Sequence, residues 1–448
     1  MSEAEPESTP LRHDPLAALR QPSFLLYTLS RFFYGTGLTL LQALLFWQVY
    51  EISESPLYLA ILGLARLIPS LIFALVGGAA ADTFNRRNIV MLAQTVPLAS
   101  SLVLALATSN DWVTLPMIYA AVAFIGVGAA FEGPARVALL PAIVREETFA
   151  NAVTVSSTVQ SFSFVTGPAL GGMLIATIGV GSTYGVFAAL ALASIVSMGL
   201  VRYRQPEGSV GGISVEAIRD GIRFVRSHQV LLGAMALDMF AVIFGGVKAL
   251  LPIYATDILE VGPRGFGYLN ASFEAGAFLM SFILVMRPPV QRTGRALIWT
   301  IVFFGIGTIV FALSRNFYLS LAVYSLIGAS DMVSVVMRST TIQLATPDYL
   351  RGRVSAVNQV FIQSSNQLNA VESGLVASVT SATFAVVTGG FGTLATVGAI
   401  AWRLPQLYAY RIPRSRSEMP AEQATRPAAS AEPGDAGAAQ PPADRPGE

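Results

Sequence analysis

The chain has 448 residues and a net charge of +1; 53% of its residues are hydrophobic and 12% are charged. About a quarter of the residues of a soluble domain are charged. This composition therefore excludes an ordinary soluble domain and indicates a protein that crosses a membrane several times. No basic stripe stands apart from the apolar runs, so we expect no nucleic-acid partner.

The residue types that carry metal or covalent chemistry are scarce. There is no cysteine, and His13 and His228 lie outside the apolar runs, which excludes disulfides, thiolate metal sites and histidine ligation inside a bilayer. The motifs G-x-x-x-x-G-K-S/T, G-x-S-x-G and H-E-x-x-H do not occur. We therefore expect no cofactor, no metal, no catalytic residue and no enzymatic activity.

Residues 1–22 are polar and lack the apolar core of a cleaved signal, so we expect a cytoplasmic N-terminal segment. Twelve apolar runs follow, each about as long as the roughly 20 residues that a membrane-spanning helix needs. They lie near 24–50, 57–81, 88–108, 113–140, 149–178, 182–202, 230–256, 266–286, 296–313, 317–344, 353–379 and 383–404. The sequence predicts an all-α membrane protein with two six-helix bundles, at 23–202 and 230–408. The joins at 178–182 and 379–383 are short enough for two spans to merge in a count.

The distribution of arginine predicts the orientation, because cytoplasmic loops of membrane proteins are enriched in basic residues. With both termini in the cytoplasm, the outer loops hold only Arg264 and Arg315. The cytoplasmic loops hold Arg86, Arg87, Arg145, Arg202, Arg204, Arg219, Arg223, Arg226, Arg287, Arg292, Arg295, Arg351 and Arg353. We expect a multi-pass protein of the inner (cytoplasmic) membrane. Four tryptophans near span ends are expected at the headgroup level: Trp47, Trp112, Trp299 and Trp402.

Residues 203–229 form the predicted linker between the bundles. Val215, Ile218, Ile222 and Val225 repeat on one side of a helical stretch, which favours a helix lying on the cytoplasmic membrane surface. An exposed linker helix without lipid contact is the alternative. Residues 409–448 are rich in Pro, Ala, Glu and Arg and are predicted to be a disordered cytoplasmic tail.

An internal repeat relates the two predicted bundles. An offset of 206 residues places Arg86 on Arg292 and Arg145 on Arg351. It also aligns Pro141 with Pro347. The matches fall in the loops that a six-plus-six duplication would pair, so the sequence predicts two bundles related by an axis normal to the membrane.

A short loop, residues 77–87, separates the second and third runs. It resembles the G-x-x-x-D-R-x-G-R-R signature of the major facilitator superfamily, with matches at Gly78, Asp82, Arg86 and Arg87. Asn85 replaces the second glycine of that signature. If this position needs a left-handed backbone, Asn tolerates it better than other residues with side chains do. An ordinary arginine-rich hairpin is the alternative reading of the loop.

The fifth run contains a G-P-x-x-G-G element formed by Gly167, Pro168, Gly171 and Gly172. Proline bends a helix and glycine lets a neighbouring helix approach, and the element resembles one found in exporter branches of the superfamily. Together with residues 131–141 and 346–356, it resembles the subgroup of the macrolide efflux proteins and the enterobactin exporter. The resemblance covers residues 20–405 and implies transport by alternating access, without a cofactor.

Charged residues inside the runs are expensive to bury and need a partner or an aqueous cavity. Glu132 and Arg136 are four residues apart and can pair directly. The resemblance implies instead that Glu132 meets Arg86, and that Asp82 lies against the beginning of the eleventh span near Arg353. That contact would form a conformational latch built from Gly78, Asp82, Arg86, Arg87, Glu132, Arg136 and Arg353.

Four intramembrane carboxylates are candidates for proton coupling: Asp331 first, then Glu372, Glu274 and Asp238. Static ion pairs are the alternative role for each of them. The candidates for contact with a substrate in the cavity are Arg31, Lys248, Gln160, Gln363 and Asn366. Asn358, Gln367 and Asn369 are weaker candidates for the same cavity.

The sequence therefore predicts a monomeric, proton-coupled exporter of a small apolar or amphipathic molecule, such as a drug-like compound or a siderophore. Its partners would be that substrate, protons and the lipid bilayer. The alternatives are an uptake permease or a lysophospholipid flippase of the same fold, or a membrane sensor that does not transport.

Overall fold

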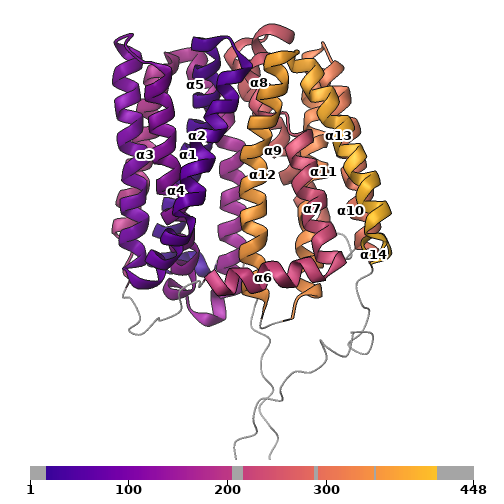
Figure 1. Ribbon diagram of the computed structural model, residues 1–448. Helices are drawn as coiled ribbons and strands as arrows, with labels where there is room; N and C mark the ends of the chain where they lie inside the picture. Colours follow the sequence, from indigo (N-terminus) through magenta and orange to yellow (C-terminus); the bar gives the residue numbers. More distant parts are fainter. Residues whose placement is uncertain (1–16, 204–214, 287–290, 348–349, 411–448) are drawn as a thin grey trace, which may run out of the picture.

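The computed structural model describes residues 17–203, 215–286, 291–347 and 350–410, and its regular elements are all helical. The first bundle holds α1 (Pro22–Ser53), α2 (Pro56–Thr83), α3 (Arg86–Ser109), α4 (Leu115–Ile143) and α5 (Phe149–Gly199). The second holds α7 (Gln229–Gly245), α9 (Gly262–Met286), α10 (Thr293–Leu313), α11 (Phe317–Ala345), α12 (Arg351–Val379) and α13 (Ala382–Arg403). The two bundles stand side by side (Figure 1).

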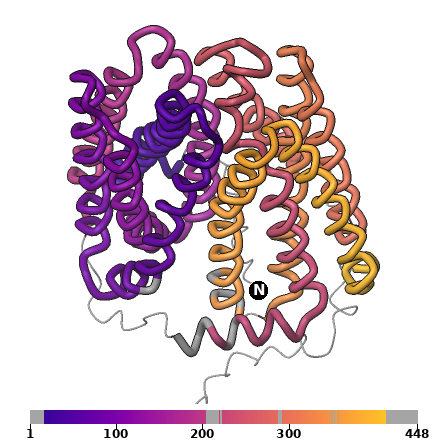
Figure 2. The backbone as a smooth tube through the Cα atoms, turned by 45° about the horizontal axis from the view of Figure 1, so that its top comes forward, coloured from indigo at the N-terminus to yellow at the C-terminus, as the bar shows by residue number. Residues whose placement is uncertain are grey.

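Helix α6 (Val215–Ser227) runs across one end of the two bundles (Figures 1 and 2). We call this end the α6 end and the opposite one the far end. Short elements complete the fold: η1 (Ala18–Arg20), η2 (Glu146–Thr148), η3 (Lys248–Leu250), α8 (Leu251–Ile253), η4 (Tyr254–Ile258) and α14 (Pro405–Ala409). The predictions for residues 1–16 and 411–448 lie outside the described residues.

Within the described ranges, ten helical segments are long and apolar enough to cross a membrane. One of them includes all of α5, which has 51 residues and is interrupted at Gly179, with φ 80° and ψ 169°. Residues other than glycine rarely adopt this φ, so Gly179 permits the turn between two consecutive helices. The join predicted at 178–182 therefore does merge two runs. Helix α12 has 29 residues but is more polar, and it is not among the ten.

The seventh run forms a broken helix. Helix α7 ends at Gly245, Gly246 is extended, and η3, α8 and η4 continue the path to Ile258. The side-chain amide of Asn369, on α12, donates to the carbonyls of Ile243 and Gly246 at 3.0 and 2.8 Å. These bonds satisfy backbone groups that the break releases. Asn369 is 5% exposed, so it stabilises the break instead of facing a cavity, as the sequence had suggested.

The helix bounds follow the repeat in the sequence. A shift of 206 residues moves α2 to 262–289, which overlaps α9, and moves α3 to 292–315, which overlaps α10. The part of α5 before Gly179 moves to 355–384, close to α12. The same shift thus relates the α2–α12 pair to the α9–α5 pair, and both pairs join the two bundles.

Small residues join the bundles near the far end. A Cβ built on Gly172 of α5 would lie 2.4 Å from Cα of Gly267 on α9, so the two backbones are in direct contact. Between α2 and α12, a Cβ built on Gly374 would lie 2.8 Å from Cβ of Ala60. Close backbone approach of this kind drives helix association where lipid supplies no hydrophobic force.

Aromatic side chains add to this far-end contact. Trp47 of α1 packs on Phe266 of α9, with ring centroids 5.3 Å apart, and the Tyr50 hydroxyl donates to Asp257 of η4. Trp47 is 5% exposed and lies between the bundles, so its ring packs on protein; its predicted level in the membrane stays a prediction. Trp112, Trp299 and Trp402 are exposed.

Helix α6 rests on the second bundle. Val225 is buried in a cluster with Leu231 of α7 and Val354 of α12, whereas Ile222 is 42% exposed. At least one position of the predicted apolar stripe therefore packs on protein and not on lipid. The side chains of Val215 and Ile218 lie outside the described part.

We expect Gly172→Leu to separate the bundles at the far end, because the new side chain has no room against Gly267. Overpacking of this kind costs about 1–3 kcal/mol. Spin labels on cysteines placed at Asp111 and Arg315, in far-end loops of the two bundles, should show a longer distance.

Gly185→Leu is the matched control, since a Cβ on Gly185 meets nothing within 4 Å. Equal label distances and melting temperatures in Gly172→Leu and the unsubstituted protein would contradict the tight contact.

Candidate transport site

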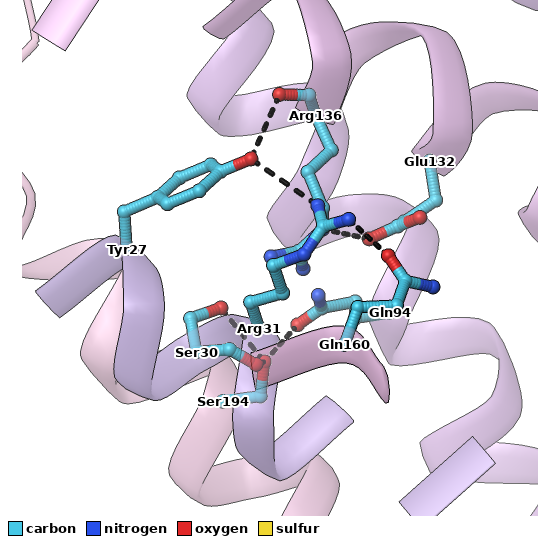
Figure 3. Close-up of polar contacts among 8 residues, drawn as sticks. All are labelled: Tyr27, Ser30, Arg31, Gln94, Glu132, Arg136, Gln160 and Ser194. Carbon is cyan, nitrogen blue, oxygen red and sulfur yellow. Dashed lines mark hydrogen bonds and ion pairs between the residues drawn. The ribbon is translucent and has the colours of Figure 1, made fainter. Parts of the chain in front are cut away.

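The first bundle holds a polar cluster in the half of its helices nearer the α6 end. Arg31 lies nine residues from the start of α1, and Gln160 lies eleven residues from the start of α5, or roughly 13–17 Å from the α6 end at 1.5 Å per residue. The Arg31 guanidinium donates to the amide oxygen of Gln160 and, at 3.4 Å, to the hydroxyl of Tyr27 (Figure 3). The sequence proposed Arg31 and Gln160 separately as substrate contacts, and the structure brings them together.

Glu132 and Arg136 form an ion pair on one face of α4 (Figure 3). The Arg136 guanidinium also lies over the rings of Tyr27 and Tyr34, 5.8 and 5.7 Å from their centroids, within the range of a cation–π interaction. Arg136 is 5% exposed. The direct pair is thus formed.

Arg86 does not take Glu132 as its partner, contrary to the contact implied by the family resemblance. It donates to the carbonyls of Ala81 and Ala138, at 3.2 and 3.0 Å. Arg87 donates to the carbonyl of Val201 at 3.0 Å. The two arginines bind carbonyls at the ends of helices, where a cation is favoured by the helix dipole.

Asn85 caps α3 and is not left-handed. Its φ is −60° and its side-chain oxygen accepts from the backbone N–H of Asn88 at 3.2 Å. The replacement of glycine therefore has a different reason from the one expected: Asn is among the best N-cap residues.

The contact of Asp82 with the beginning of α12 stays a prediction, as does the latch that depends on it. Asp82 is half-buried at the end of α2, Gly78 is buried nearby, and Arg353 is exposed. The side chains of residues 351 and 352 lie outside the described part.

A buried hydroxyl network lies beside this cluster. The Ser194 hydroxyl lies 2.8 Å from that of Ser30 and 2.9 Å from the Gln94 side-chain oxygen, joining α5, α1 and α3 (Figure 3). The sequence reasoning missed Tyr27, Tyr34 and this network, because it searched for charges. The spacing of Tyr27, Arg31 and Tyr34 on one helical face was the available signal.

The second bundle holds its charges as pairs. Arg338 of α11 lies 2.8 Å from Asp238 of α7 and donates at 3.3 Å to Asn358 of α12. Lys248, at the break of the seventh span, lies 3.2 Å from Glu274 of α9. Two of the four proton-coupling candidates, Asp238 and Glu274, therefore have basic partners.

Asp331 has no such partner. It lies 14 residues from either end of α11, close enough to interact electrostatically with Asp238, Glu274, Arg338 and Lys248. Within the described residues it makes no hydrogen bond and no ion pair. Glu372 on α12 resembles it in one respect: its buried Oε2 finds no hydrogen-bond partner in the ranges that the structure covers.

The Gly-Pro element makes packing contacts. A Cβ on Gly167 would lie 1.9 Å from Oγ1 of Thr39 on α1, and one on Gly171 would lie 3.5 Å from Leu40. Gly172 contacts α9, as described above. The non-helical residue of α5 is Gly179, eleven positions after Pro168, so the sharp turn lies outside the element that was expected to bend.

The other substrate candidates lie on exposed parts of α12. Gln363 and Asn366 are both exposed, and the Asn366 amide donates to the carbonyl of Ile362 at 2.9 Å in its own helix. Their role as substrate contacts stays a prediction.

We expect Asp238→Asn to destabilise the protein, because the change leaves the Arg338 charge buried and without its ion pair. Breaking a buried pair in this way costs about 3 kcal/mol or more. The double variant Asp238→Leu, Arg338→Met removes both charges and should recover much of the loss. Thermal melting in detergent measures both, and an unchanged melting temperature in Asp238→Asn would show that the pair has no structural role.

Comparison with known proteins agrees with this architecture. Residues 13–429 match the model of a family described as transmembrane secretion effector. The chain is 26% identical over 389 residues to the multidrug efflux pump Tap of Mycolicibacterium fortuitum, covering 83% of this chain and 93% of the pump. It is 23% identical over 322 residues to the enterobactin exporter EntS of Escherichia coli, covering 71% and 77%.

Among solved structures, a bacterial homologue of the human lysosomal transporter Spinster, in an inward-facing and unoccupied conformation, matches with a TM-score of 0.62. The match has 16% identity and covers 88% of this chain and 98% of that one. It shows the fold alone. The family match covers nearly the whole chain, and the chain belongs to the transmembrane secretion effector family of the major facilitator superfamily.

Proposed function

We propose that the protein is a twelve-span secondary transporter of the inner membrane that exports a small apolar or amphipathic molecule in exchange for protons. Two relatives match this chain over most of their own length, and they are named as an efflux pump and an exporter. The count of twelve is supported by the interruption of α5 at Gly179 and by the length of α12, which add two spans to the ten apolar segments.

The far-end contacts support alternating access as the mechanism. The bundles touch through Gly172 and Gly267 on one pair of helices and through Ala60 and Gly374 on the other. Because these pairs are related by the internal repeat, the bundles can rock about them as two bodies. We assign the described conformation to a state that is closed at the far end, and the far end to the outside.

The proposal of proton coupling rests on the position of Asp331. It lies among charges that are already paired, and a lone carboxylate at this depth is costly to keep ionised. Taking up a proton removes that cost, whereas Asp238 and Glu274 keep their charges in ion pairs. Asp331 is therefore the first candidate for the proton carrier and Glu372 the second.

We expect Asp331→Asn to abolish uphill export while leaving substrate binding intact. The substrate is first found with a panel of compounds in an efflux-deficient strain, and transport is then measured in proteoliposomes with an imposed pH gradient. Accumulation should fall at least about tenfold, since a neutral side chain cannot carry the proton. Asp111→Asn, in an exposed loop, is the control and should transport normally.

Two results would refute proton coupling by these residues. One is normal accumulation by neutral variants of Asp331, Glu372, Glu274 and Asp238. The other is transport that ignores the pH gradient from the start. Greater cellular accumulation in the presence of the protein would favour an uptake permease, and flipping of lysophospholipid in the same vesicles would favour a flippase. An intact cellular phenotype without measurable flux would favour a sensor.

We also expect both termini in the cytoplasm, because the α6 end carries most of the loop arginines. A single cysteine at Asp111 should react with a membrane-impermeant maleimide in intact cells. A cysteine at Arg145, in the exposed loop between α4 and α5, should react only after permeabilisation. The opposite pattern would invert the topology.

A further inference from the structure

The two bundles carry opposite imbalances of charge among the residues inside them. The first has three guanidinium groups, those of Arg31, Arg66 and Arg136, and one nearby carboxylate, that of Glu132, which pairs with Arg136. In the second, Lys248 and Arg338 face Asp238, Glu274 and Asp331. An excess of cations in a membrane-spanning bundle is costly unless an anion or water approaches them.

Arg136 is the most buried of these cations, and its guanidinium is only partly satisfied. Its Nε binds Glu132, but its two terminal nitrogens are buried without a hydrogen-bond partner among the described residues. The two tyrosine rings hold the guanidinium over their faces and accept none of its remaining hydrogens. The two terminal nitrogens are the pair that a planar oxyanion binds with two parallel hydrogen bonds.

The surroundings of Arg136 offer further ligands. Tyr34 lies within electrostatic range of Arg136, Arg66 and Glu132, and its hydroxyl makes no hydrogen bond with any residue in the described ranges. Arg66 is partly exposed, and its guanidinium likewise has no hydrogen bond within that part of the chain. Arg31 has a buried Nε that lacks a partner there. The cluster thus has several free donors and an exposed side.

We propose that this cluster binds an anionic oxygen group of the transported molecule, such as a carboxylate, sulfonate or phosphate, with Arg136 as the principal ligand. The proposal rests on the proposed transport function and names a chemical class of its substrate. The anion would bind the terminal nitrogens of Arg136, and Tyr34 and Arg66 would complete the contact. The apolar remainder of the molecule would face the rest of the cavity.

A matched pair of probes tests this proposal. 2-Naphthalenesulfonate carries the anionic group, and 2-naphthalenesulfonamide has the same apolar body without the charge. Their dissociation constants are measured by calorimetry on the full-length protein in nanodiscs. We expect the unsubstituted protein to bind the sulfonate at least tenfold more tightly, the difference that one charge-assisted contact supplies.

Variants locate the contact. Arg136→Gln and Arg66→Gln should each weaken sulfonate binding and leave sulfonamide binding unchanged. Glu132→Gln should strengthen sulfonate binding, because it removes the carboxylate that competes for Arg136. If Arg136→Gln fails to fold with Glu132 left unpaired, the double variant Glu132→Gln, Arg136→Gln removes both charges and should also lose the preference. Arg315→Gln removes an arginine from an exposed far-end loop and should behave as the unsubstituted protein.

The proposal is overturned if the unsubstituted protein binds the sulfonate no better than the sulfonamide, including the case in which it binds neither. It is equally overturned if the preference survives in the Arg136 variants. These binding measurements need no pH gradient, so they stay valid even if proton coupling fails. If the protein exports its substrate but shows no preference for the sulfonate, the anion proposal is rejected and the export proposal stands.

Discussion

The cost of burying charge in a bilayer is the constraint on which the interior of this protein depends. Each charged side chain in the spans must find a counter-charge, a polar contact or water. The second bundle meets this requirement with Asp238–Arg338 and Lys248–Glu274, which tie α7 to α11 and the break after α7 to α9. Asp331 and Glu372 are exceptions, since neither has a basic partner among the described residues.

The first bundle meets the same requirement in another way. It surrounds Arg136 with aromatic faces and one carboxylate, and it gives Arg31 the neutral oxygens of Tyr27 and Gln160. Neutral acceptors stabilise a cation without cancelling its charge. The bundle therefore keeps a positive field that the second bundle does not share. The two bundles, whose helices are related by an offset of 206 residues, therefore differ in the balance of charge inside them.

Much of the helical frame could be predicted from the sequence, because the length of an apolar run follows from the thickness of the bilayer. The runs near 57–81 and 88–108 differ from α2 and α3 by one or two residues at each end. Partner choice was harder to predict. Spacing alone suggested the Glu132–Arg136 pair, but the partners of Arg338 lie 100 residues before it and 20 after it along the chain. The break after Gly245 also depends on an amide supplied by a distant helix. Such contacts depend on how helices pack and not on local pattern.

Lys248 has a consequence for chemistry that is independent of transport. It is the only lysine in the chain, its side chain is 43% exposed, and it sits where the seventh span is broken, against Glu274. An acylating reagent that enters the protein interior therefore meets one side-chain amine. Glu274 is the neighbour that such a reagent must displace before it reaches the nitrogen. The chain thus offers one natural position at which a probe can be attached beside the break in the seventh span.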